Sequence, residues 1–174
     1  MALVYLVQHG DKEPLPGDPG LTAWGRRQAA VTGRWLRGAG LQALYSSPLR
    51  RARQTADCIA AATGLAVQLD GRLGERANWD GSVPFGDFLA DWARSTRDPD
   101  FVPRGGESSR QAADRLGAFL AGLPARPSPV GAVTPWRGHH RSAADPADRP
   151  GAASRPAGCG HPAVRHHHDM TSPS

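Results

Sequence analysis

The chain of 174 residues is poor in cysteine and has no long apolar run. Its two cysteines, Cys58 and Cys159, are 101 positions apart, which excludes a disulfide scaffold and a zinc site of four cysteines. No apolar run approaches the roughly 20 residues that a membrane-spanning helix needs. The apolar start at residues 2–7 is too short for a signal peptide and has no basic region before it. We therefore expect a cytoplasmic protein without membrane contacts.

Lysine is almost absent: Lys12 is the only one, against 20 arginines. Such a skew favours residues with G/C-rich codons, so it reflects the genome as much as the fold. The net charge of +5 allows affinity for anions, including phosphate or nucleic acid. No basic patch is interleaved with aromatic residues and no nucleic-acid motif is present, so we expect no nucleic-acid partner.

Large apolar residues are unevenly distributed. Residues 1–134 contain 35 of them, whereas residues 135–174 contain three, together with six of the seven histidines. The second segment cannot bury enough apolar surface to offset the entropy of ordering it. We expect a packed domain over residues 1–134 and a disordered tail over residues 135–174.

Strand and helix patterns alternate along the first 134 residues. Thr22 is placed to cap the first helix, with Ala29, Trp35 and Leu36 among its inward candidates. The expected strands are 3–8, 43–46, 65–69 and 130–134, and the expected helices are 22–38, 48–63, about 85–94 and 108–123. This order predicts an α/β fold, a three-layer α/β/α sandwich with a mostly parallel sheet. Ligands of such sheets bind at the carboxyl ends of the strands.

His9 and the segment after Ser46 both fall at such ends. Gly10 follows His9 and would let a ligand approach the backbone, although a purely structural histidine is the alternative. Pro48 opens a helix whose first turn carries arginines, where they oppose the helix dipole. That placement is expected where the amides at the helix start and an arginine side chain bind an anion together. An ordinary basic turn is the alternative.

Glu75 lies in an irregular stretch, shortly before Trp79. An aromatic neighbour can raise the pKa of a carboxyl group toward the range of a general acid, and a surface carboxylate is the alternative reading.

Together these segments resemble the histidine phosphatase (phosphoglycerate mutase-like) superfamily. The resemblance covers about residues 3–134, and its most specific part is the Ser-Pro-Leu-x-Arg-Ala-x-Gln-Thr-Ala motif. The matching segments, in chain order, are residues 6–10, Leu21-Thr22 with Gly25 and Gln28-Ala29, residues 46–56, Glu75 with residues 79–81, and residues 105–108.

The resemblance implies a mechanism as well as a fold. His9 would be the nucleophile that becomes phosphohistidine, Arg51 would hold the phosphate oxygens, and Glu75 would protonate the leaving alcohol. Arg50 and Arg53 do not match the arginine position. No metal or cofactor is implied, because arginine, histidine and helix-start amides supply the positive charge. The expected partner is a phosphorylated small molecule or a phosphoprotein.

Two departures from the family pattern stand out. Gln8 replaces the arginine of the usual Arg-His-Gly, and as a neutral phosphate ligand it would weaken binding about 3- to 30-fold. The second departure follows the fourth strand, where the family has a second pocket histidine and this chain has Pro135-Trp136. His139 and His140 are not preceded by a strand and receive no role. A phosphatase impaired by this loss is the leading hypothesis, and a pseudoenzyme that binds phosphate ligands without turnover is the alternative.

The genetic code offers an explanation for the second departure. Read one base later from residue 135 onward, the codons permit His-Gly-Gly-Val after Thr134, with the first glycine forced by Trp136. The same frame forces a stop at Met170-Thr171 and no earlier stop. One extra C in a run of C would produce this arrangement, so the C-terminal part of the fold would be missing and residues 135–174 would be a frame-shifted translation. A genuine disordered tail is the alternative.

Overall fold

The computed structural model of the chain describes residues 3–124 and 128–135. The predicted disorder of the tail falls on residues 136–174, outside the described residues. Pro135 itself is buried at the end of the packed part.

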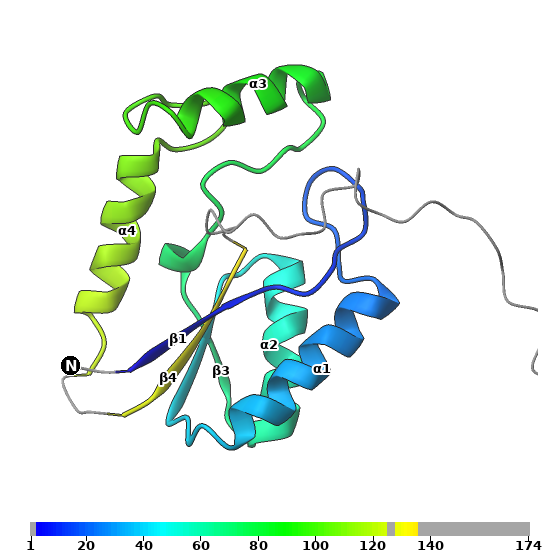
Figure 1. Cartoon of the computed structure of the whole chain (residues 1–174), viewed down its shortest axis with the longest axis vertical. Helices are drawn as coiled ribbons and strands as arrows, with labels where there is room; N and C mark the ends of the chain where they lie inside the picture. The colour runs from blue at the N-terminus through cyan, green and yellow to red at the C-terminus, as the bar shows by residue number, and fades with distance from the viewer. Residues whose placement is uncertain (1–2, 125–127, 136–174) are drawn as a thin grey trace, which may run out of the picture. The chain divides into compact units, whose positions relative to one another are not determined.

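Four parallel strands form the sheet (Figure 1). Their order is β1-β4-β2-β3, so the last of the described strands lies between the first two. The strands are β1 Val4–Gln8, β2 Ala43–Ser46, β3 Val67–Leu69 and β4 Val130–Thr134. Gln8 pairs with Thr134, and Ser46 pairs with the preceding Val133. The carboxyl ends of β1, β2 and β4 therefore meet at one edge of the sheet.

Helices cover both faces of this sheet. The helical elements are α1 Ala23–Arg37, α2 Arg50–Thr63, the 3-10 turn η1 Gly71–Leu73, α3 Phe85–Ser95 and α4 Ser109–Ala121. Figure 1 shows α1 and α2 on one face, α4 on the other, and α3 beyond the carboxyl ends of the strands. The arrangement is the predicted three-layer α/β/α sandwich.

Two apolar clusters hold the layers together, one on each face. Successive strand residues point to opposite faces, so neighbouring residues of β4 belong to different clusters. Val133 packs with Leu44 and Ile59 under α1 and α2, and Ala132 packs with Phe119 of α4. All five residues of β4 are buried, as expected for a central strand of a parallel sheet.

Local signals in the sequence set the helix boundaries. Thr22 caps α1 by accepting the amide of Gly25, and Ser108 forms a capping box with Gln111 at the start of α4. The third predicted helix ends one residue later than expected, α2 begins at Arg50 rather than Pro48, and η1 was not predicted.

The expectation that Trp35 faces the core is wrong. The side chain is 65% exposed, and its ring and that of Tyr5 meet edge to face at 5.6 Å between centroids. The buried stripe of α1 runs through Ala29, Gly33 and Leu36, and position 35 lies about 100° around the helix from that stripe.

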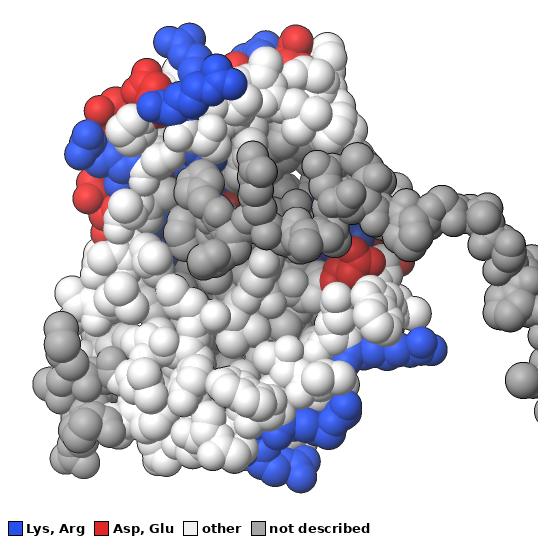
Figure 2. All heavy atoms as spheres, in the orientation of Figure 1, with Lys and Arg blue, Asp and Glu red and all other residues white. Residues whose placement is uncertain are grey.

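Charged side chains gather in two regions of the face shown in Figure 2. Figure 2 shows acidic and basic side chains interspersed over the α3–α4 end and a separate basic group over α1. Arg104 pairs with Asp91, and Arg110 pairs with Asp100. Among the described residues, no helix combines the length and the apolar character needed to cross a membrane.

Candidate active site

A cavity of about 290 Å³ opens at the carboxyl edge of the sheet. Three chain segments that are distant in sequence meet there, since β1, β4 and α2 all end or begin at this edge. The lining residues are His9, Lys12, Leu15, Arg51, Glu75, Ala77, Asn78, Trp79, Phe85, Phe88, Leu89, Trp92 and Pro135. The structure thus brings His9, Arg51 and Glu75 to one cavity.

The His9 ring has a defined tautomer. Its Nδ1 lies 2.6 Å from the carbonyl oxygen of Gly10, and a carbonyl can only accept. Nδ1 therefore carries the proton, and in the neutral ring Nε2 carries the lone pair. Strand β1 also fixes the backbone here, because the amide of His9 donates to the Thr134 carbonyl at 3.3 Å. This arrangement suits nucleophilic attack by Nε2.

Gly10 permits a close contact between backbone segments, and the expected approach of a ligand to it stays a prediction. A Cβ at this position would lie 2.4 Å from the carbonyl oxygen of Gly25, so the glycine allows the chain after β1 to approach the first turn of α1. The amide of Gly10 donates to Thr55 Oγ1 at 3.1 Å, which ties the same segment to α2.

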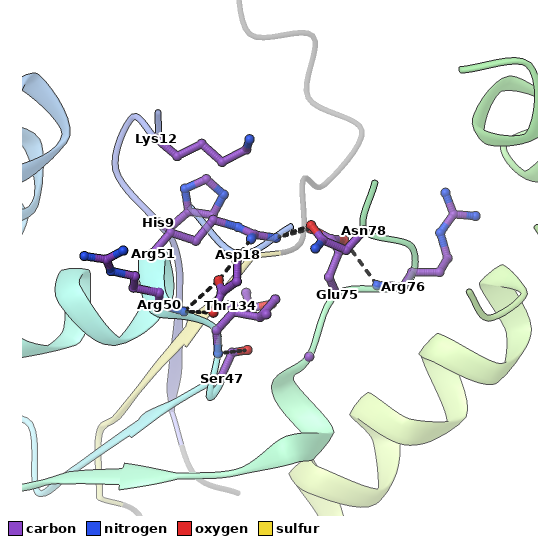
Figure 3. Close-up of polar contacts among 12 residues, drawn as sticks. His9, Lys12, Asp18, Ser47, Arg50, Arg51, Glu75, Arg76, Asn78 and Thr134 are labelled. Atoms are coloured by element: carbon purple, nitrogen blue, oxygen red, sulfur yellow. Dashed lines mark hydrogen bonds and ion pairs between the residues drawn. The ribbon is translucent and has the colours of Figure 1, made fainter. Parts of the chain in front are cut away.

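Arg51 is buried, with 2% of its surface exposed. Its Nη2 donates to Asn78 Oδ1 at 3.3 Å and to Glu75 Oε2 at 3.5 Å. Figure 3 shows the guanidinium extending past the His9 ring toward these two residues. Nε and Nη1 have no hydrogen-bond acceptor among the described residues. Buried donors are nearly always paired in folded proteins, so the arrangement suits an anion that accepts from these two atoms.

Asp18 lies beside this arginine and was not anticipated from the sequence. Its two carboxylate oxygens accept the backbone amide of Arg50, each at 2.9 Å, at the start of α2. One of them lies 3.6 Å from Arg51 Nη1. The first amide of α2 therefore already donates to a carboxylate of the protein itself. Of these groups at the start of the helix, the Arg51 side chain is the one that lines the cavity.

Asn78 is a second residue that the sequence reasoning missed. Besides accepting from Arg51, its amide nitrogen donates to the carbonyl of Gly17 at 2.6 Å, so it connects the arginine to the loop that carries Asp18. It is the single asparagine of the chain and lies three residues after Glu75, a signal that could have been noted.

Glu75 sits in a largely desolvated position, with 11% of its side chain exposed. Burial disfavours the carboxylate and raises the pKa of Glu75, and this outweighs the positive charge of Arg51 and the amide of Arg76, which donates at 3.2 Å. A raised pKa keeps the acid form present at higher pH than is usual for glutamate. The group can therefore give a proton to an oxygen in the cavity.

Gln8 is placed differently from the other predicted site residues. It is exposed and does not line the cavity. By the alternation along β1 it shares a face with Val4 and Leu6, whereas Val7 points to the opposite face. Its contact with phosphate stays a prediction.

The comparison with protein families decides to which superfamily the chain belongs. The model of the histidine phosphatase superfamily, branch 1, matches residues 4–134. The chain belongs to this superfamily.

Relatives of this chain include mutases and phosphatases by name. It is 36% identical over 146 residues to a Klebsiella pneumoniae protein named "Probable phosphoglycerate mutase GpmB", covering 75% of this chain and 68% of that protein. The chain covers 62% of a protein of that name from Salmonella paratyphi A, at 35% identity.

Solved structures of relatives include mycobacterial glucosyl-3-phosphoglycerate phosphatase. That structure matches with a TM-score of 0.62 and 29% identity, covering 74% of this chain and 71% of that one. The same phosphatase has also been solved in complex with inorganic phosphate, and this complex too matches with a TM-score of 0.62.

Among residues 3–124 and 128–135, the cavity is lined by one histidine, His9. Pro135 is fully buried directly after β4 and lines the same cavity. The second histidine expected from the resemblance would stand at this position, and proline offers no hydrogen-bonding side chain there. Within the described ranges, no group of three or more His, Cys, Asp or Glu could hold a metal ion.

Proposed function

We propose that this chain hydrolyses phosphomonoesters through a phosphohistidine formed at His9. Arg51 carries the proposal, because its buried guanidinium leaves Nε without a hydrogen-bond acceptor among the described residues, and the Asp18 carboxylate lies 3.6 Å from Nη1, beyond hydrogen-bond distance. An oxyanion that accepts from both atoms would complete these contacts. Phosphate offers several acceptor oxygens and pairs well with arginine. His9 and Glu75 line the same cavity and supply a nucleophile and an acid.

The reaction would proceed in two steps. In the first, His9 Nε2 attacks phosphorus, the bond from phosphorus to the ester oxygen breaks, and Glu75 gives its proton to the departing alcohol. In the second, the Glu75 carboxylate takes a proton from water as the water oxygen attacks phosphorus, and the N–P bond breaks to release phosphate. Arg51 stabilises the charge on the transferred group in both steps.

We favour hydrolysis over a mutase reaction, in which the phosphoryl group would return to another hydroxyl of the same substrate. The stretch between Glu75 and Gly105 is short, which leaves little room for elements that retain a product long enough to rephosphorylate it. The substrate is a phosphorylated small molecule or a phosphoprotein. Mutase and phosphatase names both occur among the relatives.

A phosphate-binding protein without turnover is the second candidate. Two observations favour it, namely the exposed Gln8 in place of arginine and Pro135 in place of the second histidine. Such a protein would hold phosphorylated ligands through Arg51 and stop before phosphoryl transfer.

Trapping the intermediate separates the two candidates. Rapid mixing with a labelled phosphomonoester should give a protein adduct that is labile in acid and stable in base. The adduct should disappear in His9→Ala and persist in Arg53→Ala, whose substituted side chain is exposed on α2. An adduct that survives His9→Ala overturns the assignment of the nucleophile. Vanadate binding without an adduct or phosphate release indicates the binding protein.

We also propose that residues 135–174 are a frame-shifted translation, which explains why the second histidine is missing. Position 135 supports this proposal. The corrected reading frame would place histidine there, and the residue now at this position, Pro135, lines the cavity. Resequencing the DNA across the codons of Thr134 and Pro135 separates a sequencing error from a real mutation. A well-packed tail with His139 or His140 inside the His9 pocket would contradict the frame shift.

A further inference from the structure

The cavity has two chemically different walls. The polar part consists of His9, Arg51, Glu75 and Asn78, with Lys12 nearby. The other wall is apolar, and most of its residues come from one short segment of chain: Trp79, Phe85, Phe88, Leu89 and Trp92. Leu15, Ala77 and Pro135 also line the cavity.

Four members of this apolar wall form one face of α3. Positions 85, 88, 89 and 92 follow the spacing of a single helix face. In a core helix such a face would be buried, yet Phe85 is 52% exposed and Leu89 is 47% exposed. Ser95 is the one fully buried residue of α3. The apolar face of α3 is therefore directed at the cavity.

The rings on this wall form a continuous series. The Trp79 and Phe85 centroids are 4.9 Å apart, Phe85 and Phe88 stack at 6.3 Å, and Phe88 and Trp92 are 6.2 Å apart. Arg76 anchors the far end by placing its guanidinium 4.4 Å from the centre of the Trp92 ring and donating to Ser109 Oγ at 2.8 Å. The rings thus present a supported apolar surface.

Three polar side chains of this segment, those of Trp79, Asp87 and Asp91, are engaged elsewhere. Trp79 Nε1 donates to the carbonyl of Val83 at 2.8 Å. Asp87 and Asp91 of α3 pair with Arg104, which does not line the cavity. A leaving group rich in hydroxyls would lose its water against this wall and gain few hydrogen bonds from it, which is unfavourable.

We infer that the phosphomonoester has an apolar, preferably aromatic alcohol as its leaving group, bound against the α3 face. This rests on the proposed function, because the phosphate is anchored by Arg51 and His9 while the alcohol extends along Trp79, Phe88 and Trp92. Burying an aromatic ring there should raise kcat/KM about 10- to 100-fold over a polar alcohol of similar size.

The test compares 2-phenylethyl phosphate with glycerol 3-phosphate. Both are esters of primary alkyl alcohols, so the comparison reports on the wall more than on leaving-group acidity. The phenyl substrate should have the higher kcat/KM by the stated factor. Phe88→Ala should reduce that advantage about tenfold, mostly through KM, and leave glycerol 3-phosphate within about twofold.

Phe101→Ala is the matched control, because Phe101 packs against Arg94 at 4.1 Å and does not line the cavity. It should leave both substrates unchanged. Equal kcat/KM for the two esters, or equal effects of the two variants, overturns the inference and leaves the proposed hydrolysis standing.

A binding measurement keeps the two proposals separable. If neither ester is turned over, hydrolysis fails, and calorimetry with benzylphosphonate against 2-hydroxyethylphosphonate still tests the wall. Tighter binding of benzylphosphonate that is lost in Phe88→Ala supports the inference. Equal affinities contradict it.

Discussion

Three arginines within four positions show how strongly a side chain depends on its place on a helix. Arg50 and Arg53 are exposed on α2, whereas Arg51 points inward beside Ala52 and Thr55. Only the inward position brings a guanidinium to the cavity. A buried cation is unfavourable unless it is paired, and Arg51 has Glu75 and Asp18 as its charged neighbours.

Arg51→Ala should weaken vanadate binding by more than tenfold, because it removes charge-assisted contacts to the anion. Arg53→Ala should leave binding within about twofold. Vanadate titration of both variants provides the measurement, and their unfolding midpoints in denaturant show that each is folded. Equal losses at the two positions would mean that the phosphate is not held at Arg51.

Glu75→Gln should change how the rate depends on pH. The pKa of Glu75 is raised by burial, so the acid form persists above the usual pH range of glutamate and is lost as pH rises through the raised pKa. For an alkyl phosphate, the ratio of the wild-type kcat to the Glu75→Gln kcat should be large at low pH. It should fall as pH rises through the raised pKa of Glu75. 4-Nitrophenyl phosphate, whose leaving group needs no proton, should show a smaller ratio. A ratio independent of pH contradicts the role of general acid.

The same shift affects stability. The folded state binds this proton more tightly than the unfolded state, so the stabilisation is complete below the ordinary glutamate pKa and is lost as pH rises through the raised one. Wild-type free energy of unfolding should therefore fall relative to Glu75→Gln across that interval, as measured by urea denaturation at several pH values. A constant difference would mean that the pKa of Glu75 is not raised.

At the scale of elements, glycines allow the backbone after β1 to lie in close contact with the first turn of α1. A Cβ on Gly25 would lie 1.9 Å from the carbonyl oxygen of Asp11, and a Cβ on Gly10 would meet Gly25. Both partners are backbone atoms, which cannot move aside as a flexible side chain can. The position of His9 therefore depends on this contact between a strand end and a helix start.

Gly25→Ala should destabilise the protein by about 2–4 kcal/mol, because the two segments must separate. Gly117→Ala is its control, since Gly117 lies within α4 with no atom near its Cβ position. That substitution should stabilise the protein by about 0.5–1 kcal/mol. Urea denaturation of both variants gives the values. An unchanged free energy of unfolding in Gly25→Ala would show that the contact is loose.

At the scale of the molecule, the two faces of the sheet are covered unequally by the described residues. Helices α1 and α2 cover one face, while on the other face Leu6 of the edge strand β1 remains 48% exposed. Leu6 pairs with Ala132, which packs with Phe119 of α4. An apolar segment after β4 would have this surface to pack on.

Restoring the reading frame should therefore improve both activity and stability. Pro135→His alone should raise kcat/KM about 10- to 150-fold, because a charged donor to phosphate contributes about 1.5–3 kcal/mol. Deleting one C from the codons of Thr134 and Pro135 should give that gain and also raise the unfolding midpoint, because the repaired chain adds apolar residues. Parallel kinetics and denaturation of the two forms measure each effect. A repaired chain that is no more stable and no more active contradicts the frame-shift proposal.

The amino-acid sequence by itself determined the elements and their local signals. The second and fourth strands lie at the predicted residues, and Thr22 and Ser108 cap their helices, because these features depend on neighbouring residues. The positions of His9 and Ser47 at strand ends follow from the same local patterns.

Only the tertiary structure decided which residues meet. The insertion of β4 between β1 and β2 brings residue 135 to the His9 cavity, and the packing of α2 on the sheet selects Arg51 among its neighbours. Asp18 reaches the start of α2 across 32 positions of sequence. The exposure of Trp35 was likewise decided by which stripe of α1 faces the sheet. These outcomes depend on contacts between distant segments, which the spacing of residues within one segment does not encode.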